Sequence, residues 1–403
     1  MLSNIELMQD VKSLRDIDVK DKRVLIRVDF NVPLDSHNNI TDDTRIKEAI
    51  SSINYCIDNE AKYIVLVTHL GQPKGFDENF SLKHIKKRVE RLLDKKITLI
   101  NDFITQKDEI LLGNATKIFL LENIRFFSGE TKNDKELSKQ LGSLCDIFVN
   151  DAFGTSHRAH SSTVGITEFV KNKVAGFLLK KEIDAFAKAL FKPVSPICLV
   201  VGGAKVSSKI SLLNNIIPKV NKIIIGGAMS NTFLKALGND MQSSLVEDEF
   251  LAEAKTILEN AKKSGVKVYL PVDVVITNNI EQAIDIRIVP VQDLLPGFSA
   301  VDIGPATVKL FEEAIGLSNT IIWNGPMGIF EIDKFSKGTF RIAHAIADSY
   351  AYSIVGGGDT ANAADKAGEK ENISFISTGG GASLELLEGK VLPGFENLEK
   401  FSQ

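Results

Sequence analysis

The segment Arg23-Val-Leu-Ile-Arg-Val-Asp-Phe-Asn-Val-Pro33 joins a short apolar run to polar residues that follow it directly. The run Val24–Val28 does not alternate between apolar and polar residues, which is typical of a strand buried on both faces of a parallel sheet. Ligands of open α/β sheets bind beyond the carboxyl ends of the strands. The segment therefore predicts a parallel α/β sheet and makes Asp29 and Asn31 candidate site residues.

Similar apolar runs recur along the chain in two sets, and helical patterns such as Asp134–Cys145 lie between them. Strands that alternate with helices predict doubly wound α/β units. The runs of the first half are Ile64–Val67, Ile97–Ile100, Ile118–Leu121 and Ile147–Val149. The runs of the second half are Ile197–Val201, Ile223–Ile225, Val266–Leu270, Thr320–Trp323, Tyr352–Val355 and Ile373–Ile376.

The length of the chain indicates more than one domain. Its 403 residues exceed the roughly 250–300 at which a single hydrophobic core stops growing. We expect the boundary near residues 177–196, because Phe177–Phe191 has helical spacing and Pro193 and Pro196 stop the helix before the next strand. This helix is either a rigid connector between two lobes or an ordinary crossover helix over one sheet, and the pattern leaves both open.

Composition excludes several classes of protein. A hydrophobic content of 44% excludes a disordered chain, and no apolar run approaches the roughly 18 residues that cross a membrane. The formal net charge of -4 argues against a general binder of nucleic acid or of membrane surfaces. Three widely spaced cysteines make no disulfide framework, which favours a reducing cytoplasm. His157 and His160 fit no zinc-ligand spacing, and Trp323 is expected in the core.

The first half carries most of the cations that grip small anions. Eight of the ten arginines lie at or before Arg158, and five of the six histidines lie at or before His160. Arginine binds phosphate and carboxylate bidentately, so this half predicts a small anionic ligand. The polar residues that follow its strands are Asp29, Asn31, His69, Asn123, Arg125, Asn150, Asp151, His157 and Arg158.

The strands of the second half end in glycine. Several such turns together indicate a backbone that approaches phosphate groups, and a nucleotide is the natural candidate. Neither a Walker A motif nor a GxGxxG fingerprint is present, which excludes a P-loop and the usual dinucleotide pocket. The glycine-rich turns are Gly202-Gly203, Gly226-Gly227, Asn324-Gly325-Pro326, Gly356-Gly357-Gly358 and Gly379-Gly380-Gly381.

Three charged residues in these turns have two interpretations each. Lys205 and Lys209 are spaced to project from one face of the helix expected after Gly202-Gly203, as a solvated basic face or as phosphate ligands. We favour phosphate, because lysine at a helix start is disfavoured by the helix dipole unless an anion binds there. Asp359 is either a helix N-cap or a ligand of nucleotide-bound Mg²⁺, and the two interpretations are compatible.

These motifs together make the chain similar to the phosphoglycerate kinase family. The first of them is long and specific, and the matches extend along essentially the whole chain. The matching segments are Arg23–Pro33, Thr68–Gly71, Leu121–Phe126, Asp151–His160, Gly202–Val206 with Lys209, Thr232–Lys235, Trp323–Pro326 with Phe330 and Glu331, Gly356–Thr360 and Ser377–Ser383.

The resemblance implies a glycolytic kinase that moves a phosphoryl group reversibly between 1,3-bisphosphoglycerate and ADP, giving 3-phosphoglycerate and MgATP. It implies a monomer of two Rossmann-like α/β lobes that close on a hinge, each lobe a mostly parallel sheet flanked by helices. The expected division is a phosphoglycerate lobe over residues 1–176, an interdomain helix over 177–191 and a nucleotide lobe over 192–389. The tail, residues 390–403, is expected to return to the first lobe.

The resemblance also assigns site residues by motif position. Glu331 matches the ribose position, Asp359 the Mg²⁺ ligand, and Arg45, Lys205, Lys209 and Gly380 the catalytic set. The expected phosphoglycerate contacts are Asp29, Asn31, Arg45, His69, Gln72, Arg125, His157 and Arg158. The expected nucleotide contacts are Lys205, Lys209, Gly226, Gly227, Gly304, Asn324, Pro326, Glu331, Gly357, Gly358, Asp359 and Thr360.

One position departs from the family pattern. The family usually has arginine after His-Leu-Gly, where this chain has Gln72. A glutamine donates a neutral hydrogen bond, whereas an arginine donates two charged hydrogen bonds to the same anion. We therefore expect the free energy of substrate binding to be weaker by about 1–2 kcal/mol. Arg125 and Arg158 would then carry more of the substrate's charge.

The chemistry of such a transfer needs no general base, because the accepting carboxylate is ionised at neutral pH. Arg45 would orient this carboxylate, Lys209 would follow the moving charge, and the amides near Gly380 would hold the phosphoryl oxygens. Two other functions stay open, of which the first fits the arginines and glycine-rich loops equally well and is disfavoured only by the number of cations in the first half, enough for a second phosphate on the substrate. One is a kinase that forms an acyl phosphate from another small carboxylic acid, and the other is a nucleotide-dependent binding protein without catalysis.

Overall fold

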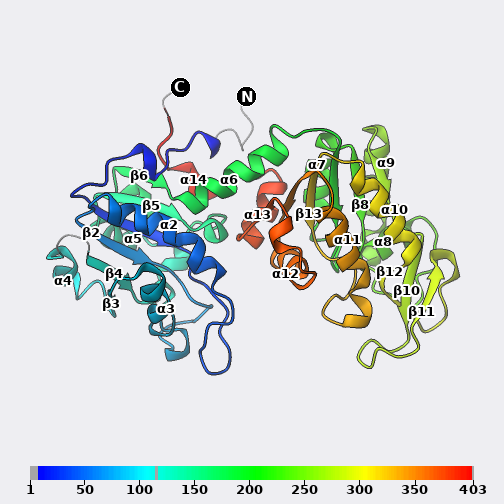
Figure 1. Cartoon of the computed structure of the whole chain (residues 1–403), viewed down its shortest axis with the longest axis horizontal. Helices are drawn as coiled ribbons and strands as arrows, with labels where there is room; N and C mark the ends of the chain where they lie inside the picture. Colours follow the sequence, from blue (N-terminus) through cyan, green and yellow to red (C-terminus); the bar gives the residue numbers. More distant parts are fainter. Residues whose placement is uncertain (1–7, 114–116, 402–403) are drawn as a thin grey trace. The chain divides into compact units, whose positions relative to one another are not determined.

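The computed structural model of the chain describes residues 8–113 and 117–401, which form two compact units. The first unit takes the described residues up to Asp184 together with the segment from Val391 onward, and the second runs from Ala185 to Lys390. Each unit is built on its own six-stranded parallel sheet with helices packed against it (Figure 1). The predicted fold class, two Rossmann-like α/β lobes, is confirmed.

The sheet of the first unit has the order β3-β4-β2-β1-β5-β6, with every neighbouring pair parallel. The five apolar runs predicted for this half are all strands. The edge strand β6 was not predicted, because its short sequence Asn-Lys-Val-Ala begins with two polar residues. The strands are β1 (Arg23–Val28), β2 (Tyr63–Val67), β3 (Ile97–Ile100), β4 (Lys117–Leu121), β5 (Ile147–Asp151) and β6 (Asn172–Ala175).

Helices cover the first sheet and explain why its strands are apolar without alternation. Alternate residues of β1, such as Val24 and Ile26, pack with Ile46 of α2 and Ile85 of α3 in one core. Leu25 lies between them on the opposite side of the strand and is also fully buried. The helices of this unit are α2 (Thr44–Asp58), α3 (Lys83–Leu93), α4 (Lys107–Leu111), α5 (Lys135–Gly142) and α14 (Pro393–Glu396).

The sheet of the second unit has the order β15-β14-β13-β7-β8-β9 and is also parallel throughout. All six predicted runs contribute a strand. Trp323 of β13 is fully buried in the core, as expected. The strands are β7 (Ile197–Val201), β8 (Lys222–Ile225), β9 (Lys267–Tyr269), β13 (Thr320–Asn324), β14 (Tyr352–Val355) and β15 (Phe375–Ile376).

A small antiparallel sheet in the second unit was not predicted. Its order is β11-β10-β12, and β11 is an exposed edge strand whose apolar residues do not mark a buried run. The strands are β10 (Asp273–Thr277), β11 (Arg287–Pro290) and β12 (Ser299–Ile303). The helices of this unit are α7 (Ile210–Ile216), α8 (Met229–Ala236), α9 (Leu251–Lys263), α10 (Pro305–Gly316), α11 (Lys337–Ala347), α12 (Gly358–Lys366) and α13 (Gly380–Leu387).

Helix α6 (Phe177–Leu190) is shared between the units, because the division at residues 184 and 185 falls inside it. The segment after Val391 packs on the first unit. The backbone N–H of Gly394 donates to Ser156 O at 2.9 Å, and that of Lys12 donates to Glu399 O at 2.7 Å. Within the described ranges, no helix is long and apolar enough to cross a membrane.

Candidate active site

The candidate site residues of the first unit lie at the carboxyl edge of its sheet. From β1 the chain first builds one side of the sheet with β2, β3 and β4, and it then builds the other side with β5 and β6. The direction in which strands are added therefore reverses between β1 and β5. Such a reversal leaves a crevice at the carboxyl ends of the two strands, where open α/β sheets bind ligands. Asp29 and Asn31 follow β1, and the loop with His157 and Arg158 follows β5.

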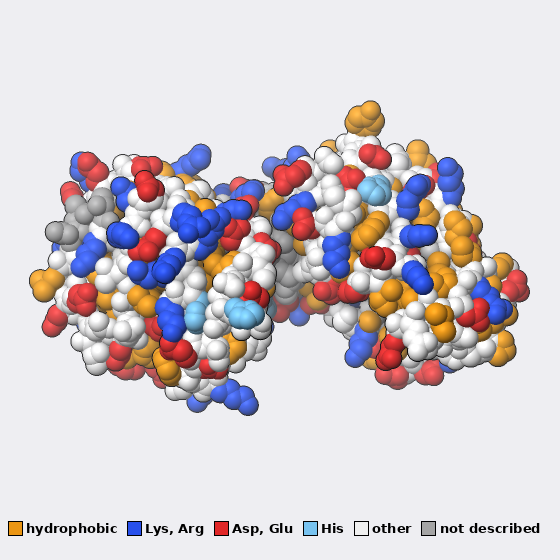
Figure 2. Space-filling model, turned by 60° about the horizontal axis from the view of Figure 1, so that its bottom comes forward, with side chains coloured by type: hydrophobic (Ala, Val, Ile, Leu, Met, Phe, Trp, Pro, Cys, Tyr) orange, Lys and Arg blue, Asp and Glu red, His pale blue; other side chains and the backbone are white. Residues whose placement is uncertain are grey.

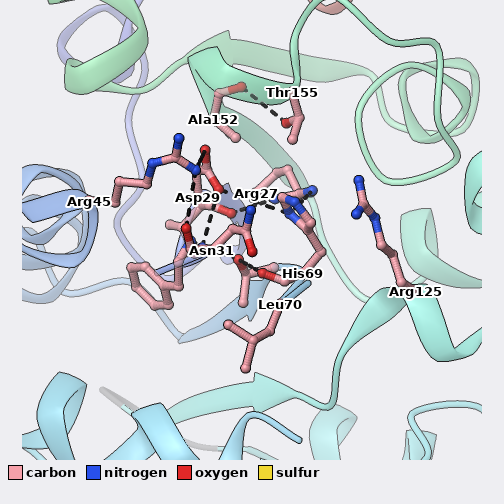
Figure 3. A network of polar contacts seen from close by, with 12 residues as sticks. Arg27, Asp29, Asn31, Arg45, His69, Leu70, Arg125, Ala152 and Thr155 are labelled. Carbon is pink, nitrogen blue, oxygen red and sulfur yellow. Dashed lines mark hydrogen bonds and ion pairs between the residues drawn. The ribbon is translucent and has the colours of Figure 1, made fainter. Parts of the chain in front are cut away.

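Arg45 is tied to the end of β1. Its Nη1 donates to Asp29 Oδ2 and to Asn31 O, both at 3.2 Å, from the first turn of α2 (Figure 3). The side chain of Asn31 accepts in turn from the backbone N–H of Gly71 at 2.8 Å. These contacts fix the guanidinium at the mouth of a cavity of about 630 Å³, which Asn31, Arg45 and Gly71 help to line.

His69 lies on the other side of Asp29 and is only 4% exposed (Figure 3). Its Nδ1 lies 3.3 Å from Arg27 Nη2 and 4.0 Å from Asp29 Oδ1. Burial holds the pKa of His69 well below its usual range, and the charges of Arg27, Arg125 and other nearby cations lower it further. His69 is therefore a neutral imidazole at neutral pH when no anion is bound.

Arg27 belongs to this cluster, although the sequence analysis did not single it out. It is 1% exposed, and its Nε donates to Ser162 Oγ at 2.9 Å. Burial lowers its pKa from the ordinary arginine value. The signal that could have found it is an arginine in the middle of an apolar strand, since a buried arginine needs a partner.

Arg125 and Arg158 extend the cluster. Arg125 follows β4 and its Nη1 donates to Gly71 O; burial lowers its pKa, and the charges of Arg158 and Arg27 lower it further. Arg158 is exposed and its Nε contacts His157 Nε2 at 3.0 Å. Gln72 is exposed on the loop that follows His69. Lysine and arginine side chains gather on one face of this unit, where histidines also reach the surface (Figure 2).

The glycine-rich turns of the second unit interlock at the carboxyl edge of its sheet. A Cβ on Gly227 would lie 2.5 Å from Gly203 N, and a Cβ on Gly325 would lie 2.3 Å from Gly202 O. Both residues also have positive φ, 64° for Gly227 and 111° for Gly325. Close packing of the three turns therefore requires glycine here, whether or not a ligand approaches.

The two lysines after β7 do not lie on a helix, which corrects the sequence analysis. Helix α7 begins at Ile210, so Lys209 is its N-cap residue and Lys205 lies in the irregular segment before it. Gly203 has a φ of 99°, and the N–H and hydroxyl of Ser207 donate to the carboxylate of Glu247 at 3.0 and 2.6 Å. These features hold the segment in a non-helical conformation that i, i+4 spacing could not reveal.

Lys209 nevertheless reaches the strand ends. Its ammonium group contacts Asn324 Oδ1, and Asn324 Nδ2 donates to Gly356 O at 2.8 Å. Burial lowers the pKa of Lys209 to about 8, although the charges of Glu388 and Asp359 oppose this shift. Lys209 is thus a partly desolvated cation, which binds a phosphate more strongly than a hydrated lysine does.

Two helix N-termini meet beside Lys209. A Cβ on Gly380, the first residue of α13, would lie 3.5 Å from the N atom of Gly358, the first residue of α12. Asp359 lies in the first turn of α12 and the N-cap is Gly357, so the N-cap interpretation of Asp359 is wrong. The hydroxyl of Thr360 accepts from Gly325 N at 2.7 Å and joins this corner to the glycine turns. Paired N-termini favour an anion.

A cavity of about 530 Å³ opens from this corner. Its lining combines polar residues such as Glu331 and Asp359 with apolar side chains such as Leu245 and Ile280. This distribution suits a flat apolar ring with a charged extension. Four of the twelve predicted nucleotide residues line it: Gly227, Pro326, Glu331 and Asp359. The predicted residues outside its lining are Lys205, Lys209, Gly226, Gly304, Asn324, Gly357, Gly358 and Thr360.

Metal binding by protein side chains alone finds no support in the described parts of the chain. Among residues 8–113 and 117–401, no three His, Cys, Asp or Glu side chains are grouped to hold an ion. A single carboxylate such as Asp359 fits a Mg²⁺ that arrives on phosphate oxygens, since Mg²⁺ usually takes only one or two carboxylates.

Comparison with known proteins gives a consistent result. The family model described as phosphoglycerate kinase matches residues 14–390. The phosphoglycerate kinase of Helicobacter hepaticus is 63% identical over 398 residues and that of Wolinella succinogenes is 62% identical over 400. These alignments cover 99% of this chain, and 99% and 100% of the two relatives.

Solved structures agree with the sequence relatives. The phosphoglycerate kinase of Coxiella burnetii superposes with a TM-score of 0.89 at 41% identity, and that of Pyrococcus horikoshii with 0.80 at 31%. Each alignment covers 96% of this chain and 98% of the other.

Proposed function

Because the chain belongs to the phosphoglycerate kinase family, and therefore transfers a phosphoryl group between 1,3-bisphosphoglycerate and ADP in glycolysis, we propose that its two units divide the substrates between them. The first unit holds the phosphoglycerate and the second holds the nucleotide. The observation that carries this division is that the two sheet edges have different chemistry. Arginines, one of them buried, gather with buried histidines at the edge of the first sheet, whereas interlocked glycine turns and two helix N-termini lie at the edge of the second.

The phosphoglycerate site is the cation cluster at the end of β1. Asp29 and Asn31 orient Arg45, while His69 and Arg125 provide polar and charged groups that point to the same crevice. An anion bound there would raise the depressed pKa of His69 and let it donate a hydrogen bond. The residues assigned to this ligand are Asp29, Asn31, Arg45, His69, Gln72, Arg125, His157 and Arg158.

The nucleotide site is the cavity beside Glu331, with its phosphates at the glycine turns. The apolar stretch near Leu245 and Ile280 takes the base, and Glu331 lies where a ribose hydroxyl needs an acceptor. The residues assigned to this ligand are Lys205, Lys209, Gly226, Gly227, Gly304, Asn324, Pro326, Glu331, Gly357, Gly358, Asp359 and Thr360.

The family works with nucleotide and magnesium, and Asp359 is the protein ligand that we assign to the ion. Its place in the first turn of α12, beside the N-terminus of α13, puts a carboxylate next to the proposed phosphates. The ion would neutralise charge on the nucleotide, which is its usual contribution in phosphoryl transfer.

Direct transfer follows from these assignments. The carboxylate of 3-phosphoglycerate is ionised at neutral pH and attacks the terminal phosphorus of ATP, and the bond to ADP breaks as the acyl phosphate forms. Arg45 orients the carboxylate, Lys209 follows the charge on the transferred group, and the first amides of α13 near Gly380 stabilise its oxygens. The two units then close about a hinge that includes α6.

The activity is tested by the consumption of MgATP with 3-phosphoglycerate, while the acyl phosphate is trapped with hydroxylamine. We expect turnover with 3-phosphoglycerate and none with acetate or aspartate. Arg45→Ala is expected to lower kcat/KM by at least about a hundredfold, as the loss of a charged orienting group does. Arg341→Ala, at an exposed arginine paired with Glu312, is the matched control and should leave kcat/KM unchanged. Faster turnover with another acid would contradict the assignment.

A further inference from the structure

A buried carboxylate lies behind the cation cluster of the first unit and is not used by the proposed mechanism. Glu130 is 1% exposed and begins the short helix Glu130–Lys132. Its Oε2 accepts from the backbone N–H of Ser162 at 2.9 Å and its Oε1 from the Ser162 hydroxyl at 2.6 Å. Both oxygens of the carboxylate therefore act as acceptors.

The surroundings of Glu130 favour its ionised form. Arg27 Nε donates to Ser162 Oγ at 2.9 Å, so the single hydroxyl proton of Ser162 is left to donate to Glu130. Together with the Ser162 N–H this gives the carboxylate two donors, which stabilise its charge. Burial opposes ionisation and raises the pKa of Glu130, but the charge of Arg27 and the Ser162 hydrogen bonds act the other way.

Glu130 is joined to the groups that face the ligand. Arg27, which it reaches through Ser162, contacts His69 Nδ1 at 3.3 Å. His160 Nδ1 lies 3.7 Å from Glu130 Oε1. The charge of Glu130 also acts on Arg125 and raises its pKa against the effects of burial and of Arg158. The negative charge of Glu130 therefore lies on the interior side of these cations, and the phosphoglycerate would approach the same cations from the solvent.

We propose that Glu130 is an internal counter-ion that competes electrostatically with phosphoglycerate for these cations and so limits the affinity of the site. The proposal rests on the proposed placement of phosphoglycerate in the first unit. In the empty protein Glu130, together with the more distant effect of Asp29, compensates the buried charge of Arg27. A bound phosphate supplies a second negative charge to the same cations, and the repulsion between the two anions weakens binding.

A purely structural role for Glu130 makes the opposite prediction. If the carboxylate only held the backbone of Ser162, its loss would loosen the loop that also carries His160, and anions would bind more weakly. The sign of the change in affinity therefore separates an electrostatic role from a structural one.

The test is Glu130→Gln, which removes the charge and keeps an acceptor for the Ser162 N–H. We expect the dissociation constants of 3-phosphoglycerate and of inorganic sulfate to fall roughly three- to tenfold, the effect of one unit charge about 10 Å away in a partly screened site. The melting temperature of the empty protein should fall, and each anion should raise it by more than in the wild type. Unchanged or weaker anion binding would overturn the proposal.

Glu122→Gln is the matched control. Glu122 is 6% exposed in the same unit, and it accepts from Ser81 Oγ and Leu82 N, both at 2.7 Å. This variant should lower the melting temperature without tighter anion binding, and tighter binding in it would contradict the proposal. If Glu130→Gln does not fold alone, sulfate or 3-phosphoglycerate should restore folding, and failure to do so would also contradict the proposal.

A parallel titration of Arg158→Ala distinguishes failure of the proposed phosphoglycerate site from failure of the counter-ion proposal. If Arg158→Ala binds 3-phosphoglycerate as tightly as the wild type, the ligand site is misplaced and both proposals fail. If Arg158→Ala loses binding while Glu130→Gln shows no gain, the site stands and only the counter-ion proposal fails.

Discussion

At the scale of single residues, Gln72 is the position where we expect, from the sequence motif, an arginine to be replaced. It is exposed on the loop after His69, so a longer cationic side chain has room there. We predict that Gln72→Arg lowers the KM for 3-phosphoglycerate roughly 5- to 30-fold, which corresponds to about 1–2 kcal/mol between a neutral and a charged hydrogen bond. Steady-state kinetics of the two proteins measure it, and an unchanged KM would show that position 72 does not reach the substrate.

The proposed contact of Lys209 with the nucleotide predicts that nucleotide binding depends on pH. Its pKa of about 8 in the empty site should rise when phosphates bind, so binding takes up about half a proton at pH 8. Above pH 8 the free ammonium is lost, and we predict that the dissociation constant of MgADP increases. Calorimetry in two buffers of different ionisation enthalpy measures the uptake. Lys209→Met should abolish the uptake, and its persistence in this variant would assign the proton to another group.

The sequence predicted the polar residues at strand ends but not the charges behind them. Asp29, Asn31 and His69 follow apolar runs directly, and the rule for open α/β sheets places them together. Arg27 and Glu130 meet only in the folded unit, through a serine at position 162. A sequence pattern cannot predict a contact between residues that lie more than a hundred positions apart, such as Arg27 and Ser162. The buried charges of the cluster could therefore be found only in the structure.

At the scale of elements, the glycine turns of the second unit give a prediction with an internal control. Gly227→Ala adds a Cβ that would lie 2.5 Å from Gly203 N at a positive φ. We expect the free energy of unfolding to fall by at least about 2–3 kcal/mol and MgADP to bind more weakly, because the new Cβ both strains the backbone and overlaps a neighbouring atom. Gly265→Ala has positive φ but no atom within 4 Å and should lose only about 1 kcal/mol with normal binding. Equal effects in urea unfolding would contradict the packing argument.

A buried acid at the end of β5 contacts the start of α6 and makes stability depend on pH. Asp151 Oδ1 accepts from Leu179 N at 3.1 Å, and burial raises the pKa of Asp151 to about 7. A raised folded pKa gives stability that is present below about pH 4 and lost as pH rises through about 7. We predict that Asp151→Asn, measured against the wild type in urea, gains about 3 kcal/mol between pH 4.5 and 8.

Asp146→Asn is the control for this pH profile. A hydrogen bond from Arg23 lowers the pKa of Asp146, so its stabilising effect disappears only at pH values below its ordinary range. The difference between this variant and the wild type should therefore be flat from pH 4.5 to 8. A flat profile for Asp151→Asn as well would mean that Asp151 is already ionised at the lower end of the window.

Strands that are buried on both faces could be predicted from their apolar runs, whereas short or exposed strands and the start of α7 could not. Long apolar runs such as Ile197–Val201 give their strands directly. The sheet of β10, β11 and β12 has short or exposed strands, and its apolar residues form a separate core that no pattern of the main sheet implies. The start of α7 was placed too early because contacts of Ser207 with Glu247, distant in sequence, prevent the helix there.

At the scale of the whole molecule, the proposed division of the two ligands between two units predicts that the units close on each other during catalysis. Phosphoryl transfer needs reacting atoms within about 3–3.5 Å of each other and a site without bulk water. We predict a smaller radius of gyration by small-angle scattering when 3-phosphoglycerate and a non-hydrolysable MgATP analogue are both bound than when either is bound alone. An identical radius in all states would contradict hinge closure.

The central claim is the division of substrates between the units, and titration calorimetry of two variants tests it most directly. Arg158→Ala in the first unit and Lys209→Met in the second are each titrated with 3-phosphoglycerate and with MgADP. The account predicts that Arg158→Ala loses affinity for 3-phosphoglycerate and keeps MgADP, while Lys209→Met shows the reverse. Loss of the other unit's ligand in either variant, or no loss in both, would contradict it.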